Sequence, residues 1–526
     1  MRTHILPEIP LIHVSKQNDI VDQLLHIIDI HESNEKIYRE EIERLKQEVA
    51  ELKNSPKKPQ IKPSSIENKK IRNKSKKRRE KKAGKKQRLP IHEEQIIALE
   101  NPPEGSCFKG HRKFFVQDIE FRIFNTLFKL ERWMSQDGKY HQAKLPPGYE
   151  NHHFGPHLRV FIKYQYYQQK VTRPRLLRML RDLGLEISEG ELNILLLEET
   201  GRLQEESKEV LKEGLIHSAY AQTDDTGARS EGRNKVCTQI GNEFFTFLQT
   251  SESKSRIEFL KLLNIQGEYS LNKYSLDYLR QHASLKLVSQ MESHLQKFSD
   301  EGALKAFFNE QKLREGQKRI VEEAALIGSI TELLGKDFVI VSDGAARFHI
   351  LKHGACWVHA LRLLEKEIPL RKEARDKVDK ILQKLRFLYH HLKRYKTKPS
   401  EVLKNRLEDY FDLVCDLRTP SKVFNEALER FSQNKDDLLR VLEAPSIPLH
   451  NNQSEQDLRD YVIRRKISYG TRSKLGMVAR DTYCSILSTC QKLGISIWKF
   501  LTDRITGSRL IQPLAFILKE RLQVSL

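Results

Sequence analysis

Apolar positions along this chain repeat in two ways, which predict two kinds of element. At 157–200 and 361–446 they recur at helical spacing, whereas short β-rich runs at 219–223 and 338–342 are typical of buried strands. Each of these short runs leads directly into an aspartate. We therefore expect an α/β core with large helical insertions.

The first run leads into Asp224-Asp225 and the second into Asp343, and small or turn residues follow both. This pattern predicts two buried strands, each of which delivers a carboxylate at its C-terminal edge, where open sheets carry their ligand sites. Apolar runs at 235–240 and 243–249 predict a hairpin after the first aspartate.

Helical signals fill the chain between this hairpin and the second aspartate. Ser253–Leu263 is expected to be a capped helix, and 265–335 a helical insert outside the sheet. The predicted order is therefore three antiparallel strands, a helix, the insert and a fourth strand.

A third carboxylate is predicted at the start of a helix near the C-terminal end. Pro448 favours an extended approach, Asn451 or Asn452 can act as the N-cap, and apolar residues then follow at helical spacing. Glu455 therefore lies in the first helical turn. The alternative is a capped, solvated helix without further function.

The same helix carries cations along its length. Arg459 falls one turn after the glutamate on the same face, and Arg465 with Lys466 lie near the end, where cations suit the helix dipole and a phosphate backbone. We expect these three side chains to hold backbone phosphates.

Two strand-end aspartates and a helix-borne glutamate suggest an all-oxygen metal site. Hard carboxylate ligands suit Mg²⁺ or Mn²⁺. Two such ions about 4 Å apart can activate an attacking oxygen and stabilise the leaving one in phosphodiester chemistry. We expect Asp224, Asp343 and Glu455 to be the ligands.

Four motifs carry a resemblance to a known family. Asp224-Asp225-Thr226, Val341–Gly344, Cys356–Ala360 and Asn451–Arg459 occur in the order seen in DDE transposases. The chain resembles the IS66 type over roughly residues 150–505, and more loosely in its N-terminal coil.

The resemblance implies a ribonuclease-H-like fold with Asp224, Asp343 and Glu455 as the catalytic triad. Asp225 stands where the family often has Glu, so it is the rival for the first position. The resemblance also gives Cys356 a structural or supporting role close to Asp343.

His359 lies in the Cys356–Ala360 motif, and Asn452 lies in the Asn451–Arg459 motif. The resemblance makes His359 a candidate for orienting a substrate phosphate, and the alternative is a buried, hydrogen-bonded histidine. As a zinc half-site, Cys356 with His359 lacks a convincing second half.

Composition points to a polyanionic partner. The 526 residues carry a net charge of +21, which favours nucleic acid ahead of a membrane surface. Six scattered cysteines indicate a reducing compartment, and no 18-residue apolar run or signal segment occurs. We expect a cytoplasmic, nucleoid-associated protein.

Much of that charge lies near the N-terminus. Residues 56–89 carry 16 Lys or Arg against two Glu and should be disordered when free. We expect a DNA-backbone arm that uses Lys76, Lys77, Arg78 and Arg79. The alternative is a solvated linker.

The preceding segment, 18–54, spaces five apolar residues in a 4-3-4-3 pattern, namely Tyr38, Ile42, Leu45, Val49 and Leu52. This favours a short coiled-coil dimer. A lone amphipathic helix packed on its own domain is the alternative.

Residues 105–135 read as strands, with Asp137-Gly138 as a turn. Relatives commonly have a Cys-rich zinc unit in this region, but here only Cys107 with His111 is present. Because the paired cysteines of a tetrahedral site are missing, zinc is not expected.

Two helices joined at Gly184 follow, the second with a Ser188–Glu191 capping box. They are compatible with a DNA-binding helix-turn-helix whose arginines, Arg173, Arg175, Arg178 and Arg181, lie near DNA. An ordinary helical hairpin is the alternative.

The expected function is that of a DNA transposase that cuts at its element's ends and joins them to target DNA. Its partners would be duplex DNA (terminal inverted repeats and target), a second copy or higher homo-oligomer, and small accessory transposition proteins, but no membrane. Two alternatives are a catalytically silent DNA-binding regulator and a nuclease of the same fold that does not join strands.

The expected divisions are a coiled-coil helix (18–54), a basic disordered linker (56–89), a small β-rich DNA-binding region (90–150), a helical region (151–217), the first part of the core (218–360, with insert 265–335), a helical insertion (361–446), the second part of the core (447–505) and a C-terminal helix (506–526).

Overall fold

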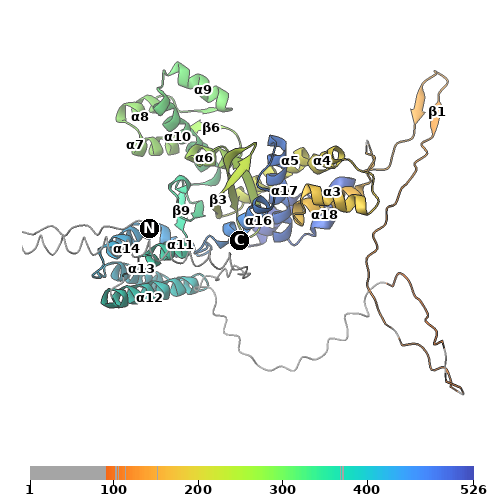
Figure 1. Ribbon diagram of the computed structural model, residues 1–526. Helices are drawn as coiled ribbons and strands as arrows, with labels where there is room; N and C mark the ends of the chain where they lie inside the picture. The colour runs from red at the N-terminus through yellow and green to blue at the C-terminus, as the bar shows by residue number, and fades with distance from the viewer. Residues whose placement is uncertain are drawn as a thin grey trace, which may run out of the picture.

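The computed structural model describes residues 91–525 except 101, 102, 105, 113, 151, 368, 370 and 371 (Figure 1). The coiled coil predicted at 18–54 and the basic linker at 56–89, with Lys76, Lys77, Arg78 and Arg79, lie outside the described residues.

A five-stranded mixed sheet forms the centre of a mainly helical chain (Figure 1). Its strands are β3 (Tyr220–Ser230), β4 (Arg233–Gly241), β5 (Thr246–Ser251), β8 (Val339–Ser342) and β9 (Lys352–Ala355). The spatial order is β5-β4-β3-β8-β9. β3, β4 and β5 are antiparallel neighbours, whereas β8 pairs in parallel with both β3 and β9. The α/β core with large helical insertions is thus confirmed, and β9 adds a strand that the sequence pattern did not indicate.

Helices surround this sheet in four groups. Before it lie α2 (Pro156–Lys163), the π-helix η2 (Tyr164–Gln168), α3 (Arg173–Asp182), α4 (Glu189–Leu197) and α5 (Thr200–Ile216). Between β5 and β8 lie α6 (Arg256–Leu263), α7 (Lys273–His282), α8 (Leu285–Glu292), α9 (Glu301–Glu310) and α10 (Glu315–Leu334). After β8 come the short η3 (Ala346–Phe348), then α11 (Trp357–Glu365), α12 (Lys372–Tyr395), α13 (Glu401–Cys415), α14 (Lys422–Gln433), α15 (Lys435–Leu438) and η4 (Arg440–Leu442). The last group is α16 (Asn452–Ser468), α17 (Lys474–Lys492), α18 (Ile497–Thr506) and α19 (Leu514–Ser525).

Strand alternation gives the sheet two different faces. Ala221 and Ile240 belong to the main hydrophobic core, which also contains residues of α5, α6 and α10. Ala228 and Cys237 instead pack with Leu458 of α16. Since successive side chains point to opposite faces, the first face is covered by the main core and the second by α16.

The free edge of the sheet is capped by side chains of α17. The backbone N–H groups of Thr246, Leu248 and Thr250 on β5 donate to Thr489 Oγ1 (3.1 Å), Ser485 Oγ (2.8 Å) and Asp481 Oδ2 (2.7 Å), respectively. Two residues along a strand span about 6.6 Å and four along a helix about 6 Å, so the two spacings match. The helix thereby satisfies backbone donors that an edge strand leaves unpaired.

The insert at 265–335 is helical, but it also contains a small sheet. Tyr269–Leu271 (β6) pairs antiparallel with Gln296–Phe298 (β7), and α10 packs against β6, α6 and α7. The hairpin was missed because strands of three residues give too short a pattern.

The insertion at 361–446 forms a hydrophobic core of its own. The predicted apolar stripe of α12 is buried within it, namely Val378, Ile381, Leu382, Leu385 and Leu388. Trp357 at the start of α11 is fully buried in the same core, and its indole Nε1–H donates to the Leu438 carbonyl at 2.6 Å.

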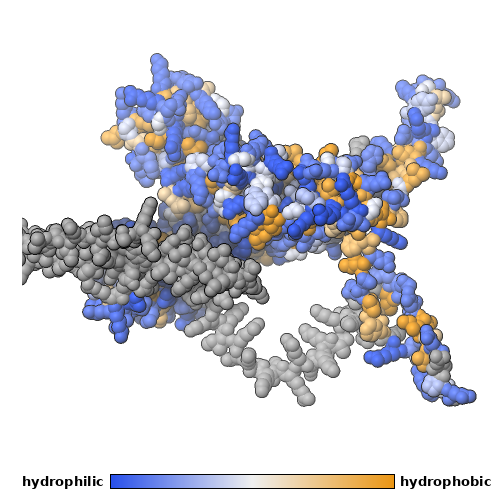
Figure 2. Space-filling view, in the orientation of Figure 1, coloured by the Kyte–Doolittle hydropathy of each residue, from blue (hydrophilic) through white to orange (hydrophobic). Residues whose placement is uncertain are grey.

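Two strand predictions need correction. Among the described residues of 105–135, regular strand is confined to the last few, where β1 (Arg132–Met134) pairs with β2 (Tyr140–Gln142) across the predicted Asp137-Gly138 turn. Aromatic residues before it, such as Phe114 and Phe124, are about four-fifths exposed and have no facing sheet to bury them. Figure 2 shows this apolar surface along the arms that precede α2.

The strand that carries the first aspartate does not end there. β3 continues past Asp224 to Ser230, because its antiparallel pairing with β4 extends to Ser230 opposite Arg233. Within the described part of the chain, every helix is too short or too polar to cross a membrane.

Candidate functional site

The two aspartates lie on neighbouring parallel segments of the sheet, Asp224 within β3 and Asp343 directly after β8. β3 pairs with β8 in a register that sets Tyr220 opposite Val339 and Gln222 opposite Val341. Two residues further along, the same register places Asp224 opposite Asp343, which directly follows β8. The prediction that a strand ends at the aspartate holds for β8, which stops at Ser342, but is wrong for β3, which continues to Ser230.

Asp224 points toward α16, the helix that carries Glu455. Its cross-strand neighbour is Gln239, whose side-chain amide donates to Asp457 on α16 at 2.9 Å. Directly opposed residues on paired strands share one face of a sheet. Asp224 and α16 therefore lie on the same side of the sheet.

Asn451 fixes the position of the Glu455 helix. It is fully buried, and its side-chain amide donates to the Thr223 carbonyl at 2.9 Å, while its side-chain oxygen accepts from Ser454 Oγ at 2.8 Å. Asn451 occupies the predicted N-cap position but makes no side-chain bond to a helix amide. Instead it ties the helix start to the residue before Asp224.

The carboxylates interact electrostatically. Burial, together with the nearby charges of Asp343, Asp225 and Glu455, raises the pKa of Asp224 to about 6, although a hydrogen bond from the Asp225 N–H opposes this. Glu455 Oε1 is buried without a hydrogen-bond partner, and His359 Nε2 lies 3.6 Å from it. An unpartnered buried carboxylate oxygen is costly unless a donor or cation reaches it.

Asp225, the rival for the first position, points away from α16. It forms ion pairs with Lys254 (2.6 Å) and with Arg347. Both cations lie outside α16, Lys254 just before α6 and Arg347 in η3. Because its charge is already matched by two cations, Asp225 is the less suitable metal ligand of the pair. Sequence reasoning missed Arg347 and Lys254, since neither belongs to a recognisable motif.

Cys356 bridges two parts of the site. Its backbone N–H donates to the Ser342 carbonyl at 3.0 Å, and its buried Sγ accepts from the Asn451 N–H at 3.3 Å. Burial raises the pKa of the Cys356 thiol, so the thiol form is favoured. Cys356 thus lies next to the end of β8, as expected from its motif, and Asn452 begins α16 beside it.

The predicted phosphate-binding cations are not equivalent. Arg459 and Lys466 are exposed on α16. Arg465 bends back onto β3, where its guanidinium donates to Thr226 Oγ1 at 3.3 Å and to the Gly227 carbonyl. Arg465 therefore helps to hold α16 on the sheet.

A buried polar relay behind Asp343 escaped the sequence patterns. Ser342 Oγ lies 2.8 Å from His353 Nε2, and His353 Nδ1 lies 2.7 Å from Asp437 Oδ2. The N–H of Gly344 also donates to Ser342 Oγ, at 3.2 Å. The relay joins the turn around Asp343 to α15. The repeat of His349 and His353 four residues apart was its only signal.

The relay also bears on metal ligation. Among the described residues, His349, His353 and Asp437 each offer one possible metal-ligand atom, and these three atoms lie within 4.8 Å of one another. The oxygens of Asp224, Asp343 and Glu455 are not grouped that tightly.

Cys107, in the degenerate zinc-unit position, is exposed and free.

Comparison with known proteins gives two matches. The model of the IS66 transposase family matches residues 328–479, a span that includes Asp343 and Glu455. A protein of Sinorhizobium fredii (strain NBRC 101917 / NGR234), named uncharacterized protein y4jO, is 40% identical over 320 residues, which cover 58% of this chain and 98% of that protein.

Proposed function

This chain belongs to the IS66 family of transposases, and from that premise we propose that it cleaves DNA at the ends of an insertion sequence and joins the resulting 3′-hydroxyl to a target strand. The observation that carries the proposal is the placement of three carboxylates from separate parts of the chain. Extending the register of β3 and β8 places Asp224 opposite Asp343, which directly follows β8, and Glu455 lies on the helix that covers the Asp224 face of the sheet.

We assign the core to the ribonuclease-H-like class. Support comes from three antiparallel strands, then helices and a strand parallel to the first, with an acidic residue on the first strand and another directly after the fourth. The helical insertions leave this order intact because they leave and re-enter the sheet between strands.

The residues present suit one or two divalent cations. The donors are hard carboxylate oxygens, burial and then the neighbouring acids raise the pKa of Asp224, and Glu455 Oε1 has no hydrogen-bond partner. Asp224, Asp343 and Glu455 would hold Mg²⁺ or Mn²⁺. When bound, the metal supplies activation of an attacking oxygen and neutralises charge on the phosphate.

The chain's own residues position the substrate and the carboxylates. Asn451 and Cys356 hold the start of α16 against β3 and β8, which fixes Glu455 relative to the aspartates. Arg459 and Lys466, both exposed on the same helix, contact backbone phosphates of the DNA. A homo-oligomer and accessory transposition proteins complete the proposed assembly.

The test is metal-dependent cleavage of a labelled duplex that carries the ends flanking the gene. Wild type is compared with Asp224→Asn, Asp343→Asn and Glu455→Gln, with Mg²⁺, with Mn²⁺ and with EDTA. Each variant should lose cleavage and strand transfer while binding the duplex as wild type does in EDTA. Glu429→Gln, which changes an exposed glutamate on α14, is the matched control and should cleave normally.

Tight duplex binding without cleavage under either metal would contradict the proposal and favour a DNA-binding regulator. Cleavage that survives in one of the three variants would remove that residue from the triad.

A further inference from the structure

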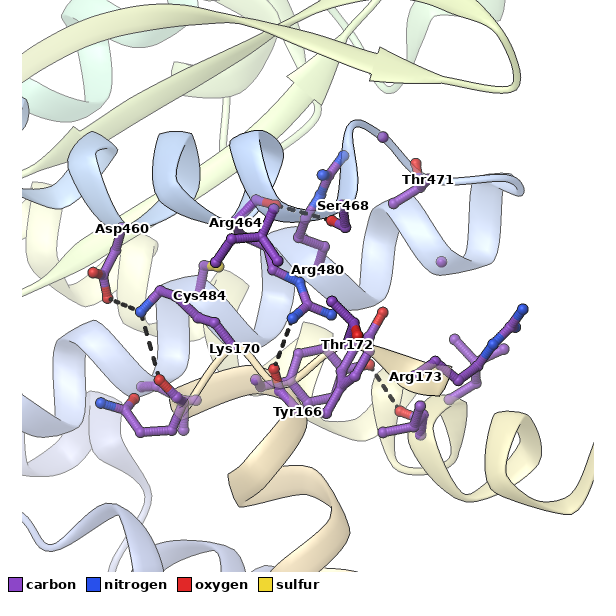
Figure 3. A pocket seen from close by; sticks show the side chains of 18 of the residues that line it. Tyr166, Lys170, Thr172, Arg173, Asp460, Arg464, Ser468, Thr471, Arg480 and Cys484 are labelled. Atoms are coloured by element: carbon purple, nitrogen blue, oxygen red, sulfur yellow. Dashed lines mark hydrogen bonds and ion pairs between the residues drawn. The ribbon is translucent and has the colours of Figure 1, made fainter. Parts of the chain in front are cut away.

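A pocket lies apart from the three carboxylates, at the other end of α16. It has a volume of about 550 Å³ and lies between η2 with the start of α3, the end of α16 and the start of α17 (Figure 3). None of Asp224, Asp343 or Glu455 lines it. From Glu455 to Arg464, which lines it, α16 rises about 14 Å at 1.5 Å per residue.

The lining is strongly basic. Five cations face one carboxylate, Asp460, and the cations are Lys170, Arg173, Arg464, Arg472 and Arg480. Lys170 pairs with Asp460 at 3.1 Å, and Arg464 donates to the carbonyls of Tyr166 (3.2 Å) and Val171 (3.3 Å). Asp460 is thus used by one lysine, and Arg173 pairs with Glu189 outside the pocket lining at 2.8 Å, so the excess positive charge rests on Arg464, Arg472 and Arg480.

Arg480 is the decisive residue. Its side chain is 5% exposed, yet its Nε and Nη1 atoms have no hydrogen-bond partner. Its Nη2 reaches only the Arg229 carbonyl, at 3.5 Å, and its guanidinium lies over the Tyr461 ring. A buried guanidinium with unused donors is costly, so an anion in the pocket would relieve a penalty already present in the fold.

The adjacent aspartate does not provide that anion. Asp481 directs both carboxylate oxygens to Thr250 on β5, at 2.7 Å from its N–H and 3.1 Å from its hydroxyl. Within the described residues, no ion pair joins Asp481 to Arg480.

Helix ends add to the positive potential. Thr172, Arg173 and Pro174 at the start of α3 line the pocket, as do Ser473 and Gly476 at the start of α17. Ser473 Oγ already accepts from the Gly476 N–H and Pro174 has no N–H, so these helix starts contribute mainly the partial positive charge of their dipoles, which favours phosphate.

We propose that this pocket binds a backbone phosphate of a DNA strand, with Arg480 at its base and Arg472 at its exposed rim. The assignment of DNA as the source rests on the proposed transposase function. About 14 Å of rise along α16 is the length of about four nucleotides at 3.4 Å each, so a single strand is long enough to reach from the pocket to the carboxylates. The pocket thereby sets the register of the strand relative to the cleavage position.

The test uses the full chain in EDTA, where no cleavage occurs. Binding of a labelled duplex is measured by fluorescence anisotropy between 50 and 300 mM salt for wild type, Arg472→Ala and Arg480→Gln. Loss of one phosphate contact should lower the slope of log K against log salt by about 0.9. Arg406→Ala, an exposed arginine on α13, is the matched control and should keep the wild-type slope.

A second measurement covers the case in which Arg480→Gln does not fold. The melting temperature is compared in inorganic phosphate and in chloride at equal ionic strength. Phosphate should raise the melting temperature of wild type and of Arg406→Ala, and raise that of Arg472→Ala less.

Several outcomes would overturn the proposal. Arg472→Ala with the same duplex affinity and slope as Arg406→Ala would exclude a strand contact. A phosphate response in wild type, together with an unchanged slope in Arg472→Ala, would identify a site for free phosphate. Because neither measurement needs cleavage, a lowered slope in a chain that never cleaves would reject the proposed activity and retain the pocket.

Discussion

The side-chain amide of Asn451 donates to the backbone carbonyl of Thr223 across 2.9 Å, and the residue after Thr223 is Asp224. One hydrogen bond thus connects a helix start to a strand 228 residues earlier in the chain. Glu455 lies one turn into that helix. The spacing between two of the three carboxylates therefore depends on a neutral, fully buried side chain that contacts neither of them directly.

Replacing that side chain should impair catalysis more than binding. Asn451→Ala removes the bond to Thr223 and the acceptor for Ser454, which allows the Glu455 helix to shift. We expect cleavage to fall by about 10- to 100-fold, as is typical when catalytic groups are misplaced by about 1 Å. Duplex affinity in EDTA should stay at the wild-type value. Gln456→Ala, an exposed change on the same helix, is the control, and equal cleavage by the two variants would contradict this role.

The two neighbouring aspartates should respond differently to the same change. Asp225 is matched by Arg347 and Lys254 on one side of the sheet, whereas Asp224 faces α16 on the other. We expect Asp224→Asn to abolish cleavage and Asp225→Asn to reduce it by no more than about tenfold, through loss of a partly buried ion pair. Parallel cleavage assays with Mn²⁺ decide this. The reverse order of effects would make Asp225 the catalytic residue.

The relay behind Asp343 should contribute to both stability and cleavage. Asp437→Asn replaces the charged acceptor of His353, which costs about 1.5–3 kcal/mol for a hydrogen bond to a charged group. We expect a lower melting temperature and weaker cleavage, because Ser342 supports the turn around Asp343. Asp436→Asn, the exposed neighbour on α15, should behave as wild type. A wild-type melting temperature in Asp437→Asn would show that the relay does not contribute to the stability of the fold.

The separate core of the helical insertion can be tested at one residue. Trp357 packs against Tyr389, Phe411 and Phe431 with ring centroids 5.6–6.4 Å apart. Trp357→Ala should lower the free energy of unfolding by about 3–5 kcal/mol. Denaturant unfolding measures this. Trp133→Ala, where the ring is 69% exposed, should change it by less than about 0.5 kcal/mol. Similar losses in both variants would contradict a distinct, tightly packed core.

Sequence patterns were sufficient to locate the two central strands of the sheet. Apolar runs that end in turn residues located β3 and β8, and the N-cap signal located the start of α16, so local pattern and resemblance together led to the three proposed carboxylates. The alternation of side chains along the strand could not show whether Asp224 or Asp225 is the first member of the proposed triad. That choice depends on which face α16 covers, and the sequence does not encode this locally.

Contacts between distant residues account for most of what was missed. His353 and Asp437 are 84 residues apart, and Arg347 reaches Asp225 across 122 residues. In 105–135 the opposite error occurred, because an aromatic-rich pattern suggested strands over a segment whose described residues pair as strand only at Arg132–Met134. Residue type indicates a preference for burial, and only tertiary packing decides whether burial is achieved.

The capped edge of β5 predicts a dependence of stability on pH. Asp481 accepts the Thr250 N–H there, and burial raises its pKa to about 7 from an ordinary value of 3.8. Between these two values the unfolded chain has released the proton and the folded chain still binds it. Asp481 therefore contributes stability that is complete below about pH 3.8 and is lost as the pH rises through about 7.

Asp481→Asn keeps an acceptor for the Thr250 N–H and carries no charge at any pH. Its free energy of unfolding, relative to wild type, should therefore increase from pH 4 to pH 8 by a few kcal/mol, on the order of 1.4 kcal/mol for each unit of pKa shift. Urea unfolding of both proteins at several pH values measures the difference. A difference that does not change with pH would mean that Asp481 is already ionised at pH 4, and that Arg480 rather than a proton balances its charge in the folded chain.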